Sequence, residues 1–130
     1  MATITARVDD WLDEEIRRFW EERGDGPSTG FRRIAEEWWT VQRFPHLEFR
    51  DGVTGRRGAI REGPDVWEVV MVARDLGGDQ EALREHFGEH LSVEALEQAL
   101  QYGDLFPDRI EEMIGENRRV ERILSAGSPG

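Results

Sequence analysis

The chain begins with a short run of alternating side chains that is typical of a single β-strand, and helix-forming sequence follows it directly. Side chains alternate across a strand, so this run has an apolar and a polar face. The apolar face holds Ile4, Ala6 and Val8, and the polar face holds Thr3, Thr5 and Arg7. A strand without a neighbour leaves its backbone N–H and C=O groups unpaired, which favours pairing with another chain. This feature therefore predicts a dimer.

Two amphipathic helices are predicted to follow the strand and to complete a domain that spans residues 1–44. Asp9 or Asp10 suits the N-cap of the first helix, and Gly24 suits its end. After a Gly/Pro-rich turn, Ser28 or Thr29 suits the N-cap of the second helix. Apolar residues recur at helical spacing in both segments. These stripes contain Leu12, Ile16, Phe19, Trp20, Ile34 and Trp38.

Strand, helix, turn and helix in this order resemble the ribbon-helix-helix family, to which Arc, MetJ and CopG belong. Two chains of that family pair their strands, and the outward face of the ribbon enters the DNA major groove. The resemblance implies a homodimer and an operator-DNA partner. Its implied dimer interface contains Ile4, Ala6, Val8, Leu12, Ile16, Phe19, Ile34 and Trp38. Its implied DNA contacts are Thr3, Thr5 and Arg7 to bases, and Ser28 and Thr29 to phosphate. The alternatives are an ordinary solvated edge strand and simple helix capping.

Residues 45–124 are predicted to form a second, mainly helical domain, and residues 125–130 a flexible tail. Residues 47–50 and 56–61 alternate like the strands of a small β-hairpin, with Asp51-Gly52 as a turn signal. Four helices are expected after it, and their starts are marked by Asp65, Asp79, Ser92 and Pro107. The two helices on either side of residues 88–91 would form a helix-turn-helix-like pair. The predicted fold class is therefore mainly α.

A series of short motifs runs through residues 45–117. It comprises Phe49, Gly52, Gly55-Arg56-Arg57, Gly63, residues 65–70, Gly77-Gly78-Asp79, Leu91-Ser92, Ala99-Leu100, Tyr102, Pro107 and Ile110-Glu111. This ordered set resembles an uncharacterised domain family found among VapB-type antitoxins. Members of that family are similar to small helix-turn-helix domains and typically occur beside toxins of the PIN-nuclease type. The resemblance implies an antitoxin with such a toxin as its partner. Many antitoxins end in a long disordered arm, whereas this second domain looks folded.

Charge is the main argument against DNA binding. The chain has 28 acidic and 17 basic residues, which gives a net charge of −11. The acidity concentrates in residues 45–106, where the net charge is −7, against −3 in residues 1–44. Phosphate contacts need local positive charge, so DNA binding would depend on a local arginine and on helix N-termini of the first domain. The acidity also makes DNA contact by the second domain unfavourable.

Two groups of arginines are candidates for binding a protein partner. Arg56 and Arg57 lie on the predicted hairpin, where the alternative is pairing with nearby carboxylates. The second group, Arg118, Arg119 and Arg122, lies near the C-terminus. PIN nucleases hold metals with clustered carboxylates, so the resemblance suggests that an inserted arginine would displace the metal. The alternative there is an ordinary helix with Glu–Arg pairs, such as one between Glu121 and Arg118.

Residues His86 to His90 match the H-x-x-E-H pattern of some zinc proteases. That chemistry needs both histidines one turn apart on a regular helix, and Gly88 between them interrupts the helix. We therefore expect no enzymatic activity, no metal site, no cofactor and no small-molecule substrate. The chain contains no Cys, no membrane-length apolar run and no signal-peptide pattern, so it is expected to be cytoplasmic and without disulfides.

These expectations combine into one functional hypothesis. The chain would be the antitoxin of a type II toxin–antitoxin pair, which binds a PIN-type ribonuclease and represses its own promoter through a dimeric ribbon. One alternative is a stand-alone ribbon-helix-helix transcriptional regulator without a toxin. Another is a dimeric protein-interaction adaptor that binds no DNA, which the net charge of −11 would suit.

Overall fold

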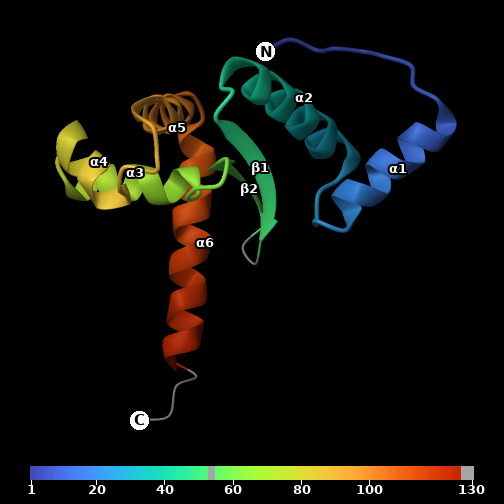
Figure 1. The fold of residues 1–130 in the computed structure, drawn as a ribbon. Helices are drawn as coiled ribbons and strands as arrows, with labels where there is room; N and C mark the ends of the chain where they lie inside the picture. The colour runs from blue at the N-terminus through green and yellow to red at the C-terminus, as the bar shows by residue number, and fades with distance from the viewer. Residues whose placement is uncertain (53–54, 127–130) are drawn as a thin grey trace. The chain divides into compact units, whose positions relative to one another are not determined.

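The computed structural model describes residues 1–52 and 55–126, which are mainly helical with one small antiparallel sheet (Figure 1). In chain order the elements are α1 (Asp10–Glu21), α2 (Pro27–Arg43), β1 (Leu47–Gly52), β2 (Gly55–Ile60), α3 (Val66–Asp75), α4 (Gln80–Phe87), α5 (Val93–Leu105) and α6 (Pro107–Ala126). The predicted fold class is confirmed at this level. The narrower ribbon-helix-helix and helix-turn-helix assignments stay predictions.

The chain divides into two compact units, and the division falls inside α2. Unit 1 comprises Met1–Trp38 and unit 2 comprises Trp39–Gly130, whereas the sequence analysis placed a domain boundary after residue 44. The end of α2 falls in unit 2, and Phe44, the residue that follows this helix, is only 1% exposed in the core of that unit. Trp39 packs edge to face on Phe44, with 6.0 Å between the ring centroids.

Unit 1 is a helix pair in which Trp20 of α1 packs against Gly30 of α2. Trp20, near the end of α1, is 3% exposed. A Cβ atom at position 30 would lie 2.6 Å from Cγ of Trp20, so only a glycine fits there. Gly24 has a φ of +79°, which lets the chain turn sharply after α1. Across this turn Arg33 Nε lies 3.1 Å from a carboxylate oxygen of Asp25.

Two predicted details at the helix starts differ from the structure. Asp9 occupies the N-cap of α1, but its side chain makes no capping hydrogen bond. Helix α2 begins at Pro27, so the prediction that Ser28 or Thr29 caps this helix is wrong. Both residues lie within the first turn instead. Proline is well suited to the first helical position because its fixed φ matches the helix and its missing N–H is not needed there.

In unit 2 the hairpin is antiparallel, and its register places Leu47 opposite Ile60 and Phe49 opposite Gly58. The side of the sheet that carries Phe49 faces α5. The ring of Phe49 lies 6.1 Å from that of Tyr102, and a Cβ atom on Gly58 would lie 3.3 Å from Cε1 of Tyr102. The missing side chain at position 58 therefore lets the strand approach the helix. Residues 51 and 52, predicted as a turn, are paired as the end of β1, and residues 53–54 lie outside the described residues.

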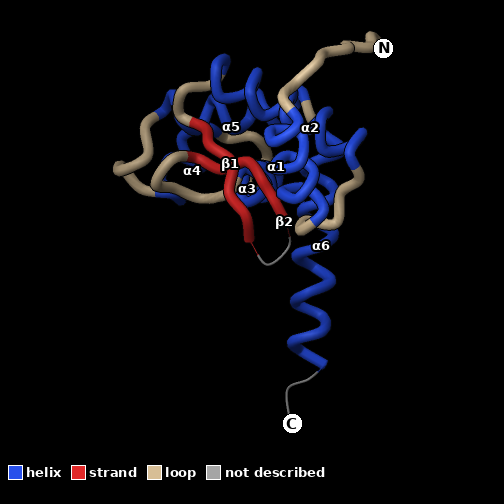
Figure 2. The backbone as a smooth tube through the Cα atoms, turned by 90° about the vertical axis from the view of Figure 1, so that its right-hand side faces the viewer, coloured by secondary structure: helices blue, strands red, loops and turns tan. Residues whose placement is uncertain are grey.

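Unit 2 has one hydrophobic core, formed by the hairpin and by helices α3, α4, α5 and α6. Figure 2 shows the two strands side by side, and both α3 and α5 contact β2. Helices α3 and α5 approach closely, since a Cβ atom on Gly103 would lie 2.9 Å from Cγ2 of Val70. The buried core side chains are Phe44, Leu47, Ile60, Val66, Val69, Leu83, Leu91, Ala95, Leu96, Ala99, Tyr102, Ile110 and Ile114.

Helices α4 and α5 start where the sequence predicted. The Asp79 carboxylate accepts hydrogen bonds from two backbone N–H groups in the first turn of α4, at 3.1 and 3.2 Å. The Ser92 hydroxyl accepts a hydrogen bond of 3.1 Å from the backbone N–H of Ala95 in α5. Gly88, with a φ of +88°, ends α4 between them. Capping residues thus define where α4 begins and ends and where α5 begins.

Helix α6 is continuous through Gly115. Its first half is anchored in the core by Ile110 and Ile114. Its second half projects away from α3, α4 and α5 (Figures 1 and 2). Of the predicted flexible tail, Ser125 and Ala126 are helical, and residues 127–130 lie outside the described residues.

Candidate DNA-binding, dimer and partner surfaces

The predicted ribbon residues lie on an exposed N-terminal segment that precedes α1. Residues 1–9 form no strand within the described parts of this single chain, and Thr3, Thr5 and Arg7 are all exposed. Ile4, on the predicted apolar face, is 87% exposed. The predicted strand needs a second chain for its hydrogen bonds, so an unpaired segment is expected in one copy alone. The ribbon stays a prediction.

Unit 1 leaves much of its predicted dimer face uncovered. Trp38 is 64% exposed and Ile34 also lies at the surface. Leu12, Ile16 and Phe19 on α1 are half-buried. Large apolar side chains at the surface suit an interaction site where they lie together. Trp11, which the sequence analysis did not assign to the interface, is exposed on the same unit as well.

The predicted phosphate-contacting residues lie at the start of α2. Ser28 is exposed and Thr29 is half-buried. The first-turn backbone N–H groups of any helix carry partial positive charge, which suits an anion. In this turn the N–H of Gly30 already donates to the carbonyl oxygen of Gly26 at 2.9 Å. The first turn of α2 is therefore compatible with phosphate contact. Since Ser28 and Thr29 do not cap the helix, capping is not the reason for a hydroxyl at these two positions.

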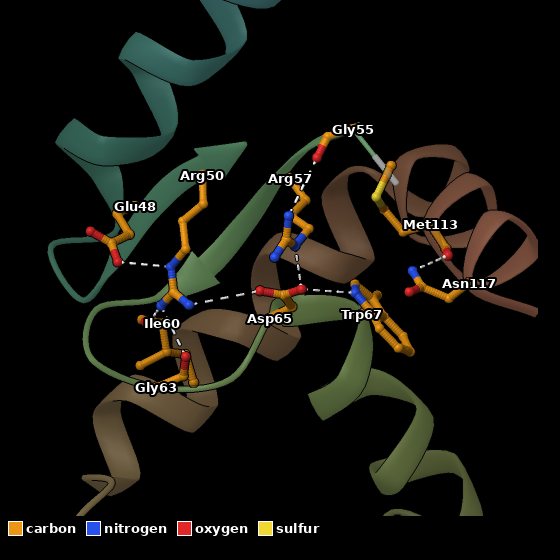
Figure 3. A network of polar contacts seen from close by, with 10 residues as sticks. All are labelled: Glu48, Arg50, Gly55, Arg57, Ile60, Gly63, Asp65, Trp67, Met113 and Asn117. Carbon is orange, nitrogen blue, oxygen red and sulfur yellow. Dashed lines mark hydrogen bonds and ion pairs between the residues drawn. The ribbon is translucent and has the colours of Figure 1, made fainter. Parts of the chain in front are cut away.

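Arg50 and Arg57 of the hairpin take part in a polar network around Asp65, which has a buried carboxylate at the start of α3 (Figure 3). One carboxylate oxygen of Asp65 accepts a hydrogen bond from Nε of Arg57 and another, of 3.1 Å, from Nε1 of Trp67. The other oxygen lies 3.9 Å from Nη1 of Arg50. Asp65 therefore holds both strands to the start of α3.

This network has a clear electrostatic cause. Arg50 and Arg57 are direct cross-strand partners, and like charges in that position repel each other. Asp65 supplies a negative charge to both. Arg50 also donates a hydrogen bond of 3.0 Å to the Glu48 carboxylate. It donates two more to the carbonyl oxygens of Ile60 and Gly63, at 2.5 and 2.9 Å. Sequence reasoning missed this cluster, although the hairpin register would have placed the two arginines opposite each other.

Arg56 and Arg57 are thus engaged inside unit 2. Arg57 binds Asp65, and Arg56 lies 3.5 Å from Asp51 on the neighbouring strand. Both side chains are partly shielded from solvent. A partner-binding role for these two residues stays a prediction, but the geometry favours the alternative that they pair with carboxylates of their own unit.

Glu68, in the first turn of α3, lies near this network and has a raised pKa. Burial raises the pKa of the Glu68 carboxyl above its usual value, and the negative charge of Asp65 raises this pKa further. Arg57 and Arg50 oppose the shift. The carboxyl therefore takes up a proton more readily in the folded chain than in the unfolded one.

The C-terminal arginines lie on the projecting half of α6. Arg119 pairs with Glu116 at 3.2 Å, and both side chains are well exposed. Arg118 and Arg122 are exposed and make no ion pair within residues 1–52 and 55–126, so the suggested Glu121–Arg118 pair is not formed there. These two guanidinium groups are available to a partner.

Two further arrangements bear on function. His86 lies in α4, whereas His90 lies beyond Gly88 and outside that helix, so the spacing needed for a zinc-protease helix is not met. The described residues contain no group of three or more side chains placed to hold a metal ion.

On α5, the second helix of the predicted helix-turn-helix pair, Glu94, Glu97 and Asp104 are exposed. These carboxylates repel phosphate and oppose DNA binding by this helix.

Compared with protein-family models, with curated proteins and with solved structures, the chain matches none. Among the helices of the described residues, none has both the length and the apolar character required to cross a bilayer.

Proposed function

We propose that this chain is the antitoxin of a type II toxin–antitoxin pair. Two copies pair through unit 1, and the paired N-terminal segments bind the operator of the chain's own promoter. Unit 2 binds a PIN-type ribonuclease and neutralises it. Both actions are steric and electrostatic, and the chain itself catalyses no reaction.

The observation that carries the proposal is the uncovered apolar face of unit 1. Trp20 is the only large apolar side chain of residues 1–38 that is buried. A helix pair of this size cannot bury enough apolar surface to fold stably alone. A second copy would cover Ile34 and Trp38, and would supply a hydrogen-bonding partner for residues 3–8. The resemblance of this unit to ribbon-helix-helix proteins gives the geometry of such a pair.

The distribution of charge supports DNA contact by unit 1 rather than by unit 2, and a protein partner for unit 2. Arg7 would project from the ribbon, where an arginine can bind guanine through two hydrogen bonds. The exposed carboxylates of α5 disfavour DNA, and they suit a ribonuclease because its RNA-binding surface must be basic. The resemblance of residues 45–117 to a domain of VapB-type antitoxins supports the same assignment.

The DNA-binding half of the proposal is tested with DNA from upstream of the chain's own gene. Arg7→Ala should weaken specific binding by about tenfold to a hundredfold, since a bidentate base contact contributes about 1–3 kcal/mol. Fluorescence anisotropy measures this affinity. Sedimentation equilibrium should give a dimer for the unmodified chain and for the Arg7→Ala variant. Arg17→Ala is the matched control, because Arg17 is also exposed in unit 1 but pairs with Asp13 at 2.9 Å. Equal affinities for the two variants would refute base reading by Arg7.

The toxin-binding half is tested by purifying the tagged chain from its native cells. A small ribonuclease should co-purify in a stoichiometric amount, and its RNA cleavage should be suppressed until the chain is removed. Specific DNA binding without a nuclease would replace this proposal by a stand-alone regulator. A dimer that binds neither would replace it by a protein-interaction adaptor.

A further inference from the structure

The outer edge of β1, on the side away from β2, is an open edge of the sheet. Among the described residues the sheet has two strands, which lie side by side in Figure 2. The main contacts of β1 are with β2 and with α5, which packs against the face that carries Phe49. The outer edge of β2 is partly covered, since Ala59 forms a bridge with Asp65. An open strand edge can accept a further strand, so β1 is the edge at which this sheet can grow.

The hydrogen bonds of the hairpin show which backbone groups of β1 point away from β2. In an antiparallel pair every second residue bonds to the neighbouring strand, and the residues between them direct their N–H and C=O groups outward. The Arg61 N–H donates to the His46 carbonyl oxygen at 2.9 Å, so the even-numbered residues of β1 face β2 and the odd-numbered ones face outward. The Leu47 N–H follows this pattern, because it donates to the Phe44 carbonyl oxygen at 3.0 Å.

Phe49 lies at the middle of this outer edge. Its ring packs on Tyr102 of α5, whereas its N–H and C=O groups point away from β2. Neither group has a hydrogen-bond partner within residues 1–52 and 55–126. In an antiparallel pair of two β1 strands, Phe49 of each copy would donate to and accept from Phe49 of the other.

The charges on either side of Phe49 match those of a second copy in antiparallel orientation. Pairing centred on Phe49 places Glu48 of each copy opposite Arg50 of the other. Both side chains lie on the same face of β1, and they are 34% and 33% exposed (Figure 3). Opposite charges in direct cross-strand positions stabilise a sheet, and like charges repel each other. An edge with charges of one sign would repel a second copy, whereas β1 is complementary to itself.

The N-terminal segment is the other strand-like part of this chain that could occupy the edge. Residues 3–8 carry Arg7 as their one charged side chain, so this segment can pair with Glu48 but leaves Arg50 unmatched. In the proposed function the same segment already pairs with its counterpart in a second copy. The β1 strand of another copy therefore fits the edge better.

We propose that two copies of this chain join their hairpins through β1 into one four-stranded antiparallel sheet. A two-fold axis at Phe49 would relate the copies, so each contributes the same surface. One pair of strand edges is a small contact, below the roughly 1,200 Å² of a stable interface, and is therefore weak by itself. It forms where copies are concentrated, for example by pairing through unit 1. Unit 2 folds without it, because its core lies within one chain.

Hydrogen exchange of single amides, followed by NMR at high protein concentration, tests this contact in the full chain. The Phe49 amide should exchange about tenfold more slowly in the unmodified chain than in a Glu48→Arg variant, in which like charges face each other across the edge. The Arg50 amide faces β2, so its equal exchange in both proteins would show that the hairpin is intact.

Glu85→Arg is the matched control, because it makes the same charge change at an exposed position of α4. Its Phe49 amide should exchange as in the unmodified chain. Equal exchange of the Phe49 amide in the unmodified chain and in the Glu48→Arg variant would overturn the inference. This result would leave the antitoxin proposal untouched, since the β1 contact requires neither DNA nor ribonuclease.

A mixture of two differently isotope-labelled copies of the unmodified chain identifies the strand at the edge. Nuclear Overhauser contacts between copies should join Glu48 of one copy to Arg50 of the other, because these residues would lie directly opposite each other. Contacts from Phe49 to residues 3–8 would instead make the N-terminal segment the added strand, and the inference would be wrong. The absence of any contact between copies at β1 would also overturn it.

Discussion

Unit 1 and unit 2 use apolar side chains in opposite ways. Among the described residues, unit 2 collects thirteen buried side chains into one core. Unit 1 buries Trp20 and leaves Ile34 and Trp38 at the surface. Unit 2 therefore covers its apolar residues within one chain, whereas unit 1 does not. If unit 1 pairs as proposed, its stability depends on association and that of unit 2 does not.

The strongest way to sharpen this contrast is a cavity in the core of unit 2. Leu47→Ala should lower the free energy of unfolding of unit 2 by about 2–5 kcal/mol, because Leu47 is fully buried. Urea denaturation followed by circular dichroism, at several protein concentrations, measures the effect. The affected transition should not move with protein concentration, whereas a second transition, from unit 1, should.

Leu105→Ala is the matched control for this experiment, since Leu105 is exposed on α5 of the same unit. It should change the free energy of unfolding by less than about 0.5 kcal/mol. The contrast between the units fails if every transition depends on protein concentration, because unit 2 would then also need association to fold.

A smaller effect is expected from the polar network that joins the hairpin to α3. Asp65→Asn keeps the shape of the side chain but removes the charge that Arg50 and Arg57 share. We expect a loss of about 2 kcal/mol, below the cost of breaking a fully buried pair because both arginines keep some solvent exposure. Asp75→Asn, at an exposed position of α3, is the control. Equal urea midpoints for the two variants would show that the network does not stabilise unit 2.

The smallest expected effect concerns Glu68 and pH. Since the folded state raises the pKa of this carboxyl, its charged form opposes folding above that pKa, and this penalty disappears as pH falls towards the ordinary value. Glu68→Gln should therefore stabilise unit 2 slightly at neutral pH and not at acidic pH. Thermal unfolding between pH 4 and pH 8 measures the difference, with Glu85→Gln on the exposed side of α4 as the control. A gain that persists at pH 4 would exclude titration as its cause.

Local chemistry explains which parts of the fold were predictable. Asp79 and Ser92 cap their helices as expected, because capping depends on a few neighbouring backbone groups. The start of α2 was misplaced because Pro27 is itself a good first residue, which made the hydroxyls that follow it unnecessary as caps. The division between the two units also differs from the predicted boundary, since the burial of Phe44 depends on distant residues of the core.

The candidate surfaces were harder to predict than the elements that carry them. The arginines of the hairpin and of α6 look alike in the sequence, but Arg57 is bound to Asp65 whereas Arg118 has no acidic partner among the described residues. That difference arises from strand register and from where the core ends, which are tertiary properties. The predicted ribbon could not be seen in one chain, because its hydrogen bonds would come from another.

Two glycines of this chain are in such close contact with a side chain of another helix that they restrict which mutations the fold can accept. Gly30 lies against Trp20 in unit 1, and Gly103 lies against Val70 in unit 2, with no space for a Cβ atom at either position. A mutation at either glycine would have to be accompanied by a change in the facing side chain. Among descendants of this sequence, these two pairs should therefore vary together or not at all, whereas the exposed acids of α5 are free to drift one by one. Relatives are best recognised by such pairs.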